Sequence, residues 1–323
     1  MNIGILLWNT CNARCEHCAV SSGPTEKPVM SNEDIFKVID ATFYNTKHPY
    51  IGLSGGEAFF FFDRLKLIVE YASKKGAQIS INTNAFWGKN ENKAMRYVKE
   101  IKESGANKLV VSTDDFHTPY VNEECVINVI KACFYYHLEV DIQYVVSKDT
   151  TRLYDFLKRN SDKLLNVNTR EIPVHPVGRA EKSIKENSYI GNKKIPKGLC
   201  PSSILSVSAD GRLIPCCNTA GHLKQLGLGT VDDDIVQIYE KFNREPLFYT
   251  IRKYGPSSLY AKAQEYGLED PKYGYVDQCH LCYEMFKDEI RAEKLKNEAR
   301  KISIHDIYSN YEQLFQEKFQ NKS

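Results

Sequence analysis

The chain has 323 residues, of which 42% are hydrophobic, and its 43 lysine and arginine residues nearly balance 41 acidic residues. This length is enough for one large domain and a smaller one, and the sequence lacks the long basic run typical of a nucleic-acid or membrane-surface site. Its apolar runs, such as residues 3–8, are too short to span a bilayer, and its first residues do not have the layout of a signal peptide. We therefore expect a globular cytoplasmic protein with no nucleic-acid and no membrane partner. Its ten cysteines are not expected to form disulfides, and those in clustered spacings indicate metal or redox chemistry.

The first two-thirds of the chain alternates strand-like and helix-like segments. Apolar residues spaced three and four apart predict helices, and Ser31 with Asp34 is the signature of a capping box at the start of the first one. Six strand–helix units predict an α/β fold with a parallel sheet, curved as a partial (β/α)6 TIM barrel with its chemistry at the carboxyl ends of the strands. Short β-branched and apolar runs predict strands at residues 3–8, 50–53, 78–82, 108–112, 139–147 and 169–174.

Three cysteines lie together in the loop after the first predicted strand, at Cys11, Cys15 and Cys18. Three thiolates leave a tetrahedral zinc ion one ligand short, whereas a [4Fe–4S] cluster held by three cysteines keeps one iron open. An open iron can bind a substrate. A zinc site with a remote fourth ligand is the alternative interpretation.

With its spacing C-x3-C-x2-C, this loop resembles that of the radical S-adenosylmethionine (SAM) superfamily. The resemblance implies that the open iron binds the amino and carboxylate groups of SAM. It also implies that an electron from the cluster cleaves SAM to methionine and a 5′-deoxyadenosyl radical. By the same resemblance His17 places a ring against the adenine, and the loop Gly55-Gly56-Glu57 holds the amino group of SAM.

Polar residues at the ends of later strands extend the predicted SAM and substrate site. The resemblance implies that Arg179, after Gly178, meets the SAM carboxylate, although a surface ion pair is the alternative. His117 and His175 are candidate catalytic groups, or polar histidines satisfied at a strand end. Strand-end side chains that can bond the ribose and the substrate, or simply cap the strands, are Asn82, Asn84, Ser112 and Asp114.

A second set of cysteines follows residue 190. It resembles the auxiliary-cluster pattern of the SPASM/twitch subgroup, in which a cysteine, then Gly-x4-Cys, then a distant C-x2-C bind a second [4Fe–4S] cluster. No cysteine follows the last of these, so we expect the smaller, twitch-like form with one auxiliary cluster. A structural Zn(Cys)4 ribbon is the alternative, and Asp210–Gly211 predicts a hairpin turn inside the region. The cysteines that match are Cys200, Cys216, Cys279 and Cys282.

Cys217 directly follows one of these predicted ligands. Consecutive side chains of an extended segment point to opposite sides, so Cys216 and Cys217 are not expected to bind the same cluster. A thiol beside the active site that does not bind the cluster resembles the hydrogen donor of radical SAM peptide epimerases, which convert an L-residue of a ribosomally made peptide to a D-residue. Alternatively, Cys217 is a buried small side chain, the true ligand in place of Cys216, or a remnant of a thioether-forming enzyme.

The predicted organisation is a radical SAM barrel at residues 1–190, an auxiliary-cluster domain at 191–285 and a helical tail at 286–323. The expected cofactors are SAM and two [4Fe–4S] clusters. The expected partners are a precursor peptide and an electron donor such as flavodoxin or ferredoxin. The chain begins in the first strand, so we expect peptide recognition by the barrel or by a separate protein. Two alternative functions stay open: a maturase that forms thioether or carbon–carbon cross-links, and a zinc-binding interaction protein without radical chemistry.

Overall fold

The computed structural model describes residues 1–164, 167–200 and 204–319. Within this part of the chain the strands form one sheet of nine, in the order β6-β5-β4-β3-β2-β1-β7-β8-β9. Strands β1 to β6 are parallel, as the alternating pattern predicts, and β7 adds in parallel to the other side of β1, while β8 and β9 are antiparallel. The strands are β1 (Ile3–Leu6), β2 (Tyr50–Ser54), β3 (Gln78–Thr83), β4 (Lys108–Ser112), β5 (Glu139–Val146), β6 (Asn168–Pro173), β7 (Leu205–Val207), β8 (Arg212–Ile214) and β9 (Gly229–Thr230).

The two faces of the parallel part of the sheet carry different side chains. Ile5 and Leu53 are neighbours in register and are buried in the main hydrophobic core, which also includes Ile35 of helix α1 (Asn32–Thr42). Because side chains alternate along a strand, their neighbours in sequence point to the opposite, concave face. That face carries glycine and polar residues at the strand ends, which leaves space for a ligand: Gly4, Ser54, Asn82, Ser112 and Gln143.

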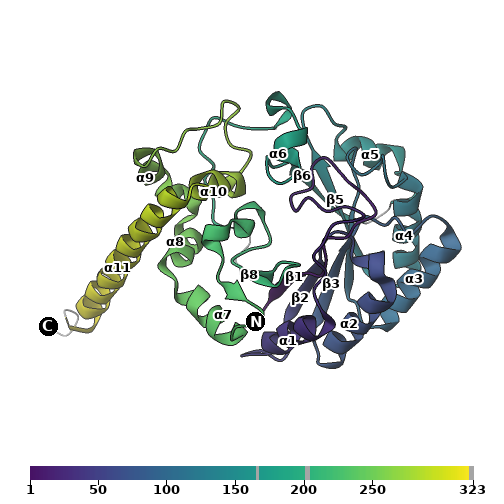
Figure 1. Ribbon diagram of the computed structural model, residues 1–323, viewed down its shortest axis with the longest axis horizontal. Coiled ribbons are helices and arrows are strands. Elements are labelled where there is room, and N and C mark those ends of the chain that lie inside the picture. The colour runs from purple at the N-terminus through teal and green to yellow at the C-terminus, as the bar shows by residue number, and fades with distance from the viewer. Residues whose placement is uncertain (165–166, 201–203, 320–323) are drawn as a thin grey trace.

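The helices connect and cover the strands, with α1 to α5 on the outer side of the parallel sheet (Figure 1). The N-cap half of the capping box predicted at Ser31 is present, because its hydroxyl accepts from the Asp34 backbone N–H at 3.0 Å. The Asp34 carboxylate accepts from that hydroxyl at 2.6 Å, whereas a complete box would have it accept from the Ser31 backbone N–H. None of the described helices combines the length and apolar content needed to cross a membrane. The α-helices are α1 (Asn32–Thr42), α2 (Phe62–Lys74), α3 (Glu91–Glu103), α4 (Glu123–Tyr135), α5 (Leu153–Arg159), α6 (Ala180–Ser183), α7 (Ile235–Arg244), α8 (Pro246–Tyr254), α9 (Tyr260–Glu265), α10 (Gln278–Phe286) and α11 (Glu289–Phe319).

The first strand is shorter than predicted. It ends at Leu6 instead of residue 8, because the chain turns there into the cysteine loop. Trp8 forms an isolated bridge with Val29, and Asn9 donates a backbone hydrogen bond to Pro28 at 3.0 Å. These two contacts hold the start of the loop, at residues 8–9, against its end at residues 28–29.

The C-terminal part continues the sheet instead of standing apart from it. Strands β7 and β8 form the hairpin predicted at Asp210–Gly211, and Gly211 has φ +80°, which favours glycine. Because β7 pairs with β1, the sheet runs without a break into the region predicted as an auxiliary domain. The boundary near residue 190 therefore stays a prediction.

The predicted tail forms the single helix α11, at the edge of the molecule far from the barrel (Figure 1). Its residues Ala292, Leu295 and Ala299 are buried, and the helix packs against α8. The last four residues of the predicted tail, 320–323, lie outside the described residues. Cys125 and Cys133, which lie on α4, are buried, and Cys133 belongs to the main hydrophobic core.

Candidate active site and metal centres

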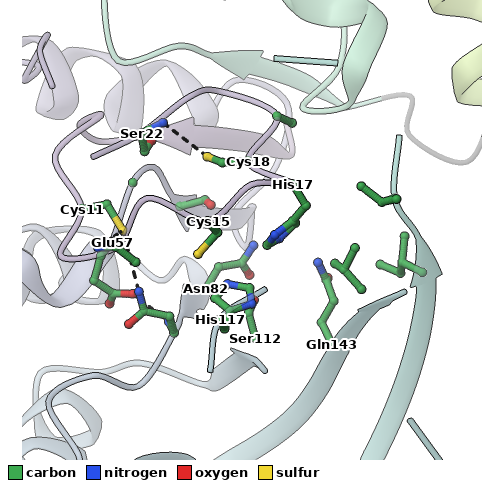
Figure 2. Close-up of a pocket in the computed structure, with 18 of the residues that line it drawn as sticks. Cys11, Cys15, His17, Cys18, Ser22, Glu57, Asn82, Ser112, His117 and Gln143 are labelled. Atoms are coloured by element: carbon green, nitrogen blue, oxygen red, sulfur yellow. Dashed lines mark hydrogen bonds between the residues drawn. The ribbon is translucent and has the colours of Figure 1, made fainter. Parts of the chain in front are cut away.

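A cavity of about 290 Å³ opens at the carboxyl ends of the parallel strands, where the fold prediction placed the chemistry. Side chains from the strand ends and from the loop after β1 meet around it (Figure 2). Asp114 and Arg179 are not among the residues that line it; each instead supports a part of its wall. The predicted site residues that line the cavity are Cys11, Cys15, His17, Cys18, Gly55, Gly56, Glu57, Asn82, Asn84 and Ser112.

Arg179, which lies between β6 and α6, holds the cysteine loop in place. Its guanidinium donates to the Cys15 carbonyl at 2.7 Å and to the Ser22 carbonyl, and its backbone N–H donates to the Cys18 carbonyl at 3.0 Å. The preceding Gly178 has φ +59°, and a Cβ there would lie 2.2 Å from the Ala19 carbonyl oxygen. The absence of a side chain at Gly178 therefore lets the backbone approach the cysteine loop closely. In the described contacts the Arg179 guanidinium donates to two carbonyls of the cysteine loop. Its predicted contact with a SAM carboxylate stays a prediction.

The three cysteines of the loop suit a metal group. Cys11 and Cys15 are buried, and all three residues line the same cavity. Burial raises the pKa of the Cys11 thiol to about 12 and raises the pKa of Cys15 as well. Such thiols ionise when a cation binds them, because the metal ligand is the thiolate. Three thiolates facing one cavity fit a [4Fe–4S] cluster with one open iron.

Glu57 is buried and joins the loops after β2 and β3. Its carboxylate accepts from the backbone N–H groups of Asn84 at 2.7 Å and Phe59 at 3.0 Å, and from the Thr83 hydroxyl at 2.7 Å. Burial nevertheless raises the pKa of Glu57. A cationic group in the cavity would favour its ionised form. The predicted contact between Glu57 and the SAM amino group is thus chemically suitable, and it stays a prediction.

His17 presents a neutral ring to the cavity. Burial lowers the pKa of His17 to about 4, and its Nδ1 atom is buried without a hydrogen-bond partner in the described part of the chain. The ring lies 5.0 Å from that of Phe116 and 4.9 Å from that of His117, measured between centroids. An uncharged ring in an aromatic group is suited to stacking on a base, as predicted for His17.

His117, one of the two candidate histidines, lines the cavity, whereas Asp114 lies behind it. Its Nδ1 lies 2.9 Å from a carboxylate oxygen of Asp114, which is buried and also accepts from the Val145 backbone N–H at 3.2 Å. Burial opposes both charges, but the pair still raises the pKa of His117 and lowers that of Asp114. Possible ligand atoms of Cys15, His17 and His117 lie within 4.8 Å of one another, a further donor set that sequence reasoning did not combine.

The second set of cysteines also comes together. A small cavity of about 30 Å³ is lined by all four predicted ligands, which come from the segment before β7, the end of β8 and helix α10. Burial raises the pKa of Cys216 to about 12 and the pKa of Cys282 well above its ordinary value. Four thiols around one cavity fit either a [4Fe–4S] cluster or a Zn(Cys)4 site. The four are Cys200, Cys216, Cys279 and Cys282.

Cys217 is separated from that set. Both adjacent cysteines lie in the loop after β8, which ends at Ile214, so the separation does not arise from the strand alternation on which the prediction relied. It is exposed and does not line the small cavity. A Cβ added to Gly4, on the concave face of β1, would lie 3.8 Å from the Cβ of Cys217. The next residue, Asn218, lines both the small cavity and the large one. Cys217 therefore lies on the side of the hairpin that faces the barrel.

Sequence reasoning missed several contributors to the two sites. Gln143, on the concave face of β5, lines the large cavity, and Asn218 borders both cavities. Asp277 caps helix α10 and pairs with His175 at 2.9 Å. An Asp two residues before Cys279 is a recognisable N-cap signal, whereas its partner 102 positions earlier leaves no local signal in the sequence.

Comparisons with known proteins agree with this architecture. Residues 5–139 match the family described as the radical SAM superfamily. The chain is 25% identical over 325 aligned positions to YydG of Bacillus subtilis (strain 168), provisionally described as a peptide biosynthesis protein, with 98% of each chain covered.

Two similar solved structures are those of native anSMEcpe with bound AdoMet and a peptide. With the Cp18Cys peptide the TM-score is 0.54 at 16% identity, over 94% of this chain and 100% of that one. With the Kp18Cys peptide it is 0.55 at 16% identity, over 93% and 99%. At this identity the likeness shows a shared fold. The match to the radical SAM family covers residues 5–139, which include the three-cysteine loop and the loop with Glu57.

Proposed function

We propose that this protein is a radical SAM enzyme that modifies a ribosomally made peptide, and that its reaction is the conversion of an L-residue to a D-residue at the α-carbon. The peptide substrate is supported by the similarity to YydG, which is described in terms of peptide biosynthesis, and by the fold shared with peptide-bound anSMEcpe. The observation that carries the choice of epimerisation is the place of Cys217. Its thiol belongs to an exposed residue beside the concave face of β1, apart from the four clustered cysteines.

In this proposal, different residues of the large cavity bind the first cluster and the separate groups of SAM. Cys11, Cys15 and Cys18 hold the first cluster, His17 lies against the adenine, and Glu57 accepts from the amino group. Further polar contacts to SAM or the peptide come from Asn82, Asn84 and Ser112. When bound, the first cluster and SAM supply a 5′-deoxyadenosyl radical that abstracts the α-hydrogen of the substrate residue.

Cys217 completes the reaction from the other side of the substrate. Its S–H bond breaks homolytically, the hydrogen atom forms a new C–H bond at the α-carbon, and a thiyl radical remains on sulfur. One electron and one proton restore the thiol. We assign the electron to an external donor of the flavodoxin or ferredoxin class and the proton to solvent, which reaches this exposed residue. An auxiliary [4Fe–4S] cluster at the four-cysteine site, in a domain at residues 191–285, belongs to the same proposal, as does a cytoplasmic location.

The test is anaerobic turnover in D2O with a candidate precursor peptide, followed by tandem mass spectrometry. Epimerisation with a solvent-exchangeable donor predicts a gain of about one dalton at single α-carbons, because a thiol exchanges its hydrogen with water. A loss of about two daltons would instead indicate cross-linking or dehydrogenation and would contradict the proposal.

Three cysteine variants sharpen this test. Cys217→Ala is expected to keep SAM cleavage while losing the D-product, and Cys216→Ala is expected to lose iron from the second site. Cys133→Ala, a buried cysteine of α4, is the control variant and should keep both the D-product and the iron of the second site. Equal iron loss in Cys216→Ala and Cys217→Ala would show that the two cysteines do not divide into one ligand and one donor, and would contradict the assignment of the pair.

A further inference from the structure

Among the four clustered cysteines, Cys279 is held at three separate atoms by the described contacts. Its backbone N–H donates to a carboxylate oxygen of Asp277 at 2.9 Å. Its carbonyl accepts from the Thr219 hydroxyl at 3.2 Å, and its sulfur accepts from the side-chain amide of Asn218 at 3.5 Å. Backbone and sulfur are therefore fixed by different neighbours.

One of these contacts leads directly to the large cavity through Asn218. This residue lines the large cavity, together with the three-cysteine loop, and it also lines the small cavity of the four cysteines. Its amide is within hydrogen-bond distance of a thiolate ligand on one side. A peptide that filled the large cavity would therefore lie beside a residue that donates to Cys279.

A second contact leads to the same cavity through Asp277 and His175. His175, just after β6, lines the large cavity, and its Nε2 lies 2.9 Å from one carboxylate oxygen of Asp277. The other oxygen of Asp277 caps the start of α10 by accepting from the backbone N–H groups of Cys279 and His280. Movement of His175 therefore acts on the end of the helix that carries two of the four cysteines.

We propose that Asn218 and His175 are positioning residues that couple occupancy of the peptide cavity to the redox potential of the group held by the four cysteines, with Cys279 as the shared contact. This inference rests on the proposed function, because it takes that group to be a [4Fe–4S] cluster. Hydrogen bonds to cluster sulfurs and the orientation of the ligands both set the potential of such clusters. A donor to sulfur stabilises the more negative, reduced state, so loss of the Asn218 hydrogen bond lowers the potential.

The proposal is tested by redox titration of the reconstituted full-length protein, monitored by electron paramagnetic resonance. The three-cysteine cluster is recognised by its response to SAM, and the other cluster is followed with and without a substrate peptide. Asn218→Leu, which keeps the number and branching of the side-chain heavy atoms, is expected to lower the midpoint potential of the second cluster at unchanged iron content. His175→Phe is expected to diminish the shift that the peptide produces.

Gln278→Leu is the matched control for this titration. Its amide lines the same small cavity, but among the described contacts it donates no hydrogen bond to Cys279. A potential in Asn218→Leu equal to that of wild type, or an equal change in Gln278→Leu, would overturn the inference. Zinc in place of iron at the four-cysteine site would overturn both the inference and the proposed cluster. A shifted potential with no D-product in the wild-type protein would overturn epimerisation alone.

Discussion

The two cysteine sites of this protein are built in opposite ways. The first takes three cysteines from one short loop and faces a cavity of about 290 Å³. The second takes four cysteines from three segments and surrounds a cavity of about 30 Å³. Three ligands beside a large space suit a metal group that binds a substrate, whereas four ligands around a small space suit a group that stays fully coordinated. The difference agrees with the proposed function, in which the first site makes and breaks bonds and the second transfers electrons or supports the structure.

The largest effect expected from this comparison is the loss of SAM cleavage in Cys15→Ala. Removing one of three thiolates leaves too few ligands to hold a cluster with one open iron. Formation of 5′-deoxyadenosine under anaerobic, reducing conditions should therefore fall to background. Cys279→Ala, which removes a ligand of the closed site, should still form 5′-deoxyadenosine. Undiminished formation in Cys15→Ala, or equal loss in both variants, would remove the distinction between the two sites.

A smaller effect is expected when the support of the open site is removed. Arg179 donates to two carbonyls of the cysteine loop, and hydrogen bonds from a charged group contribute about 1.5–3 kcal/mol each. Arg179→Leu should lower the free energy of unfolding by an amount of that order and reduce iron at the first site, as measured by urea denaturation and metal analysis.

A surface arginine provides the control for that measurement. Arg244, whose side chain is 80% exposed, forms an i,i+4 ion pair with Glu240. Exposed pairs of this kind contribute only a few tenths of a kcal/mol, so Arg244→Leu should be close to wild type. If Arg179→Leu kept its stability and its iron, the guanidinium would be available for the SAM carboxylate predicted from the sequence.

The sequence predicted what depends on local pattern, and it missed what depends on distant contacts. Period-two apolar runs placed six strands to within two residues at each end, and cysteine spacing identified the residues that gather at both sites. The use of Arg179 was harder to predict, because residue type alone does not distinguish a carboxylate partner from carbonyl partners. The pair of His175 with Asp277 is formed only when β6 and α10 meet in the folded chain.

The smallest expected effect concerns the buried pair of Asp114 and His117 at the wall of the open site. The pair raises the pKa of His117 above 6.5 and lowers that of Asp114 below 3.8. A raised histidine pKa contributes stability that is fully present below 6.5 and is lost as the pH rises through the folded-state value. A lowered aspartate pKa contributes stability above 3.8 that is lost only on acidification. The metal-free protein should therefore exceed His117→Gln in free energy of unfolding most clearly between these two values, with a smaller difference at alkaline pH. Urea denaturation across this range measures the difference, and His305→Gln, at an exposed histidine, should show none. A difference that did not change with pH would mean that His117 stabilises the cavity wall by packing rather than by its charge.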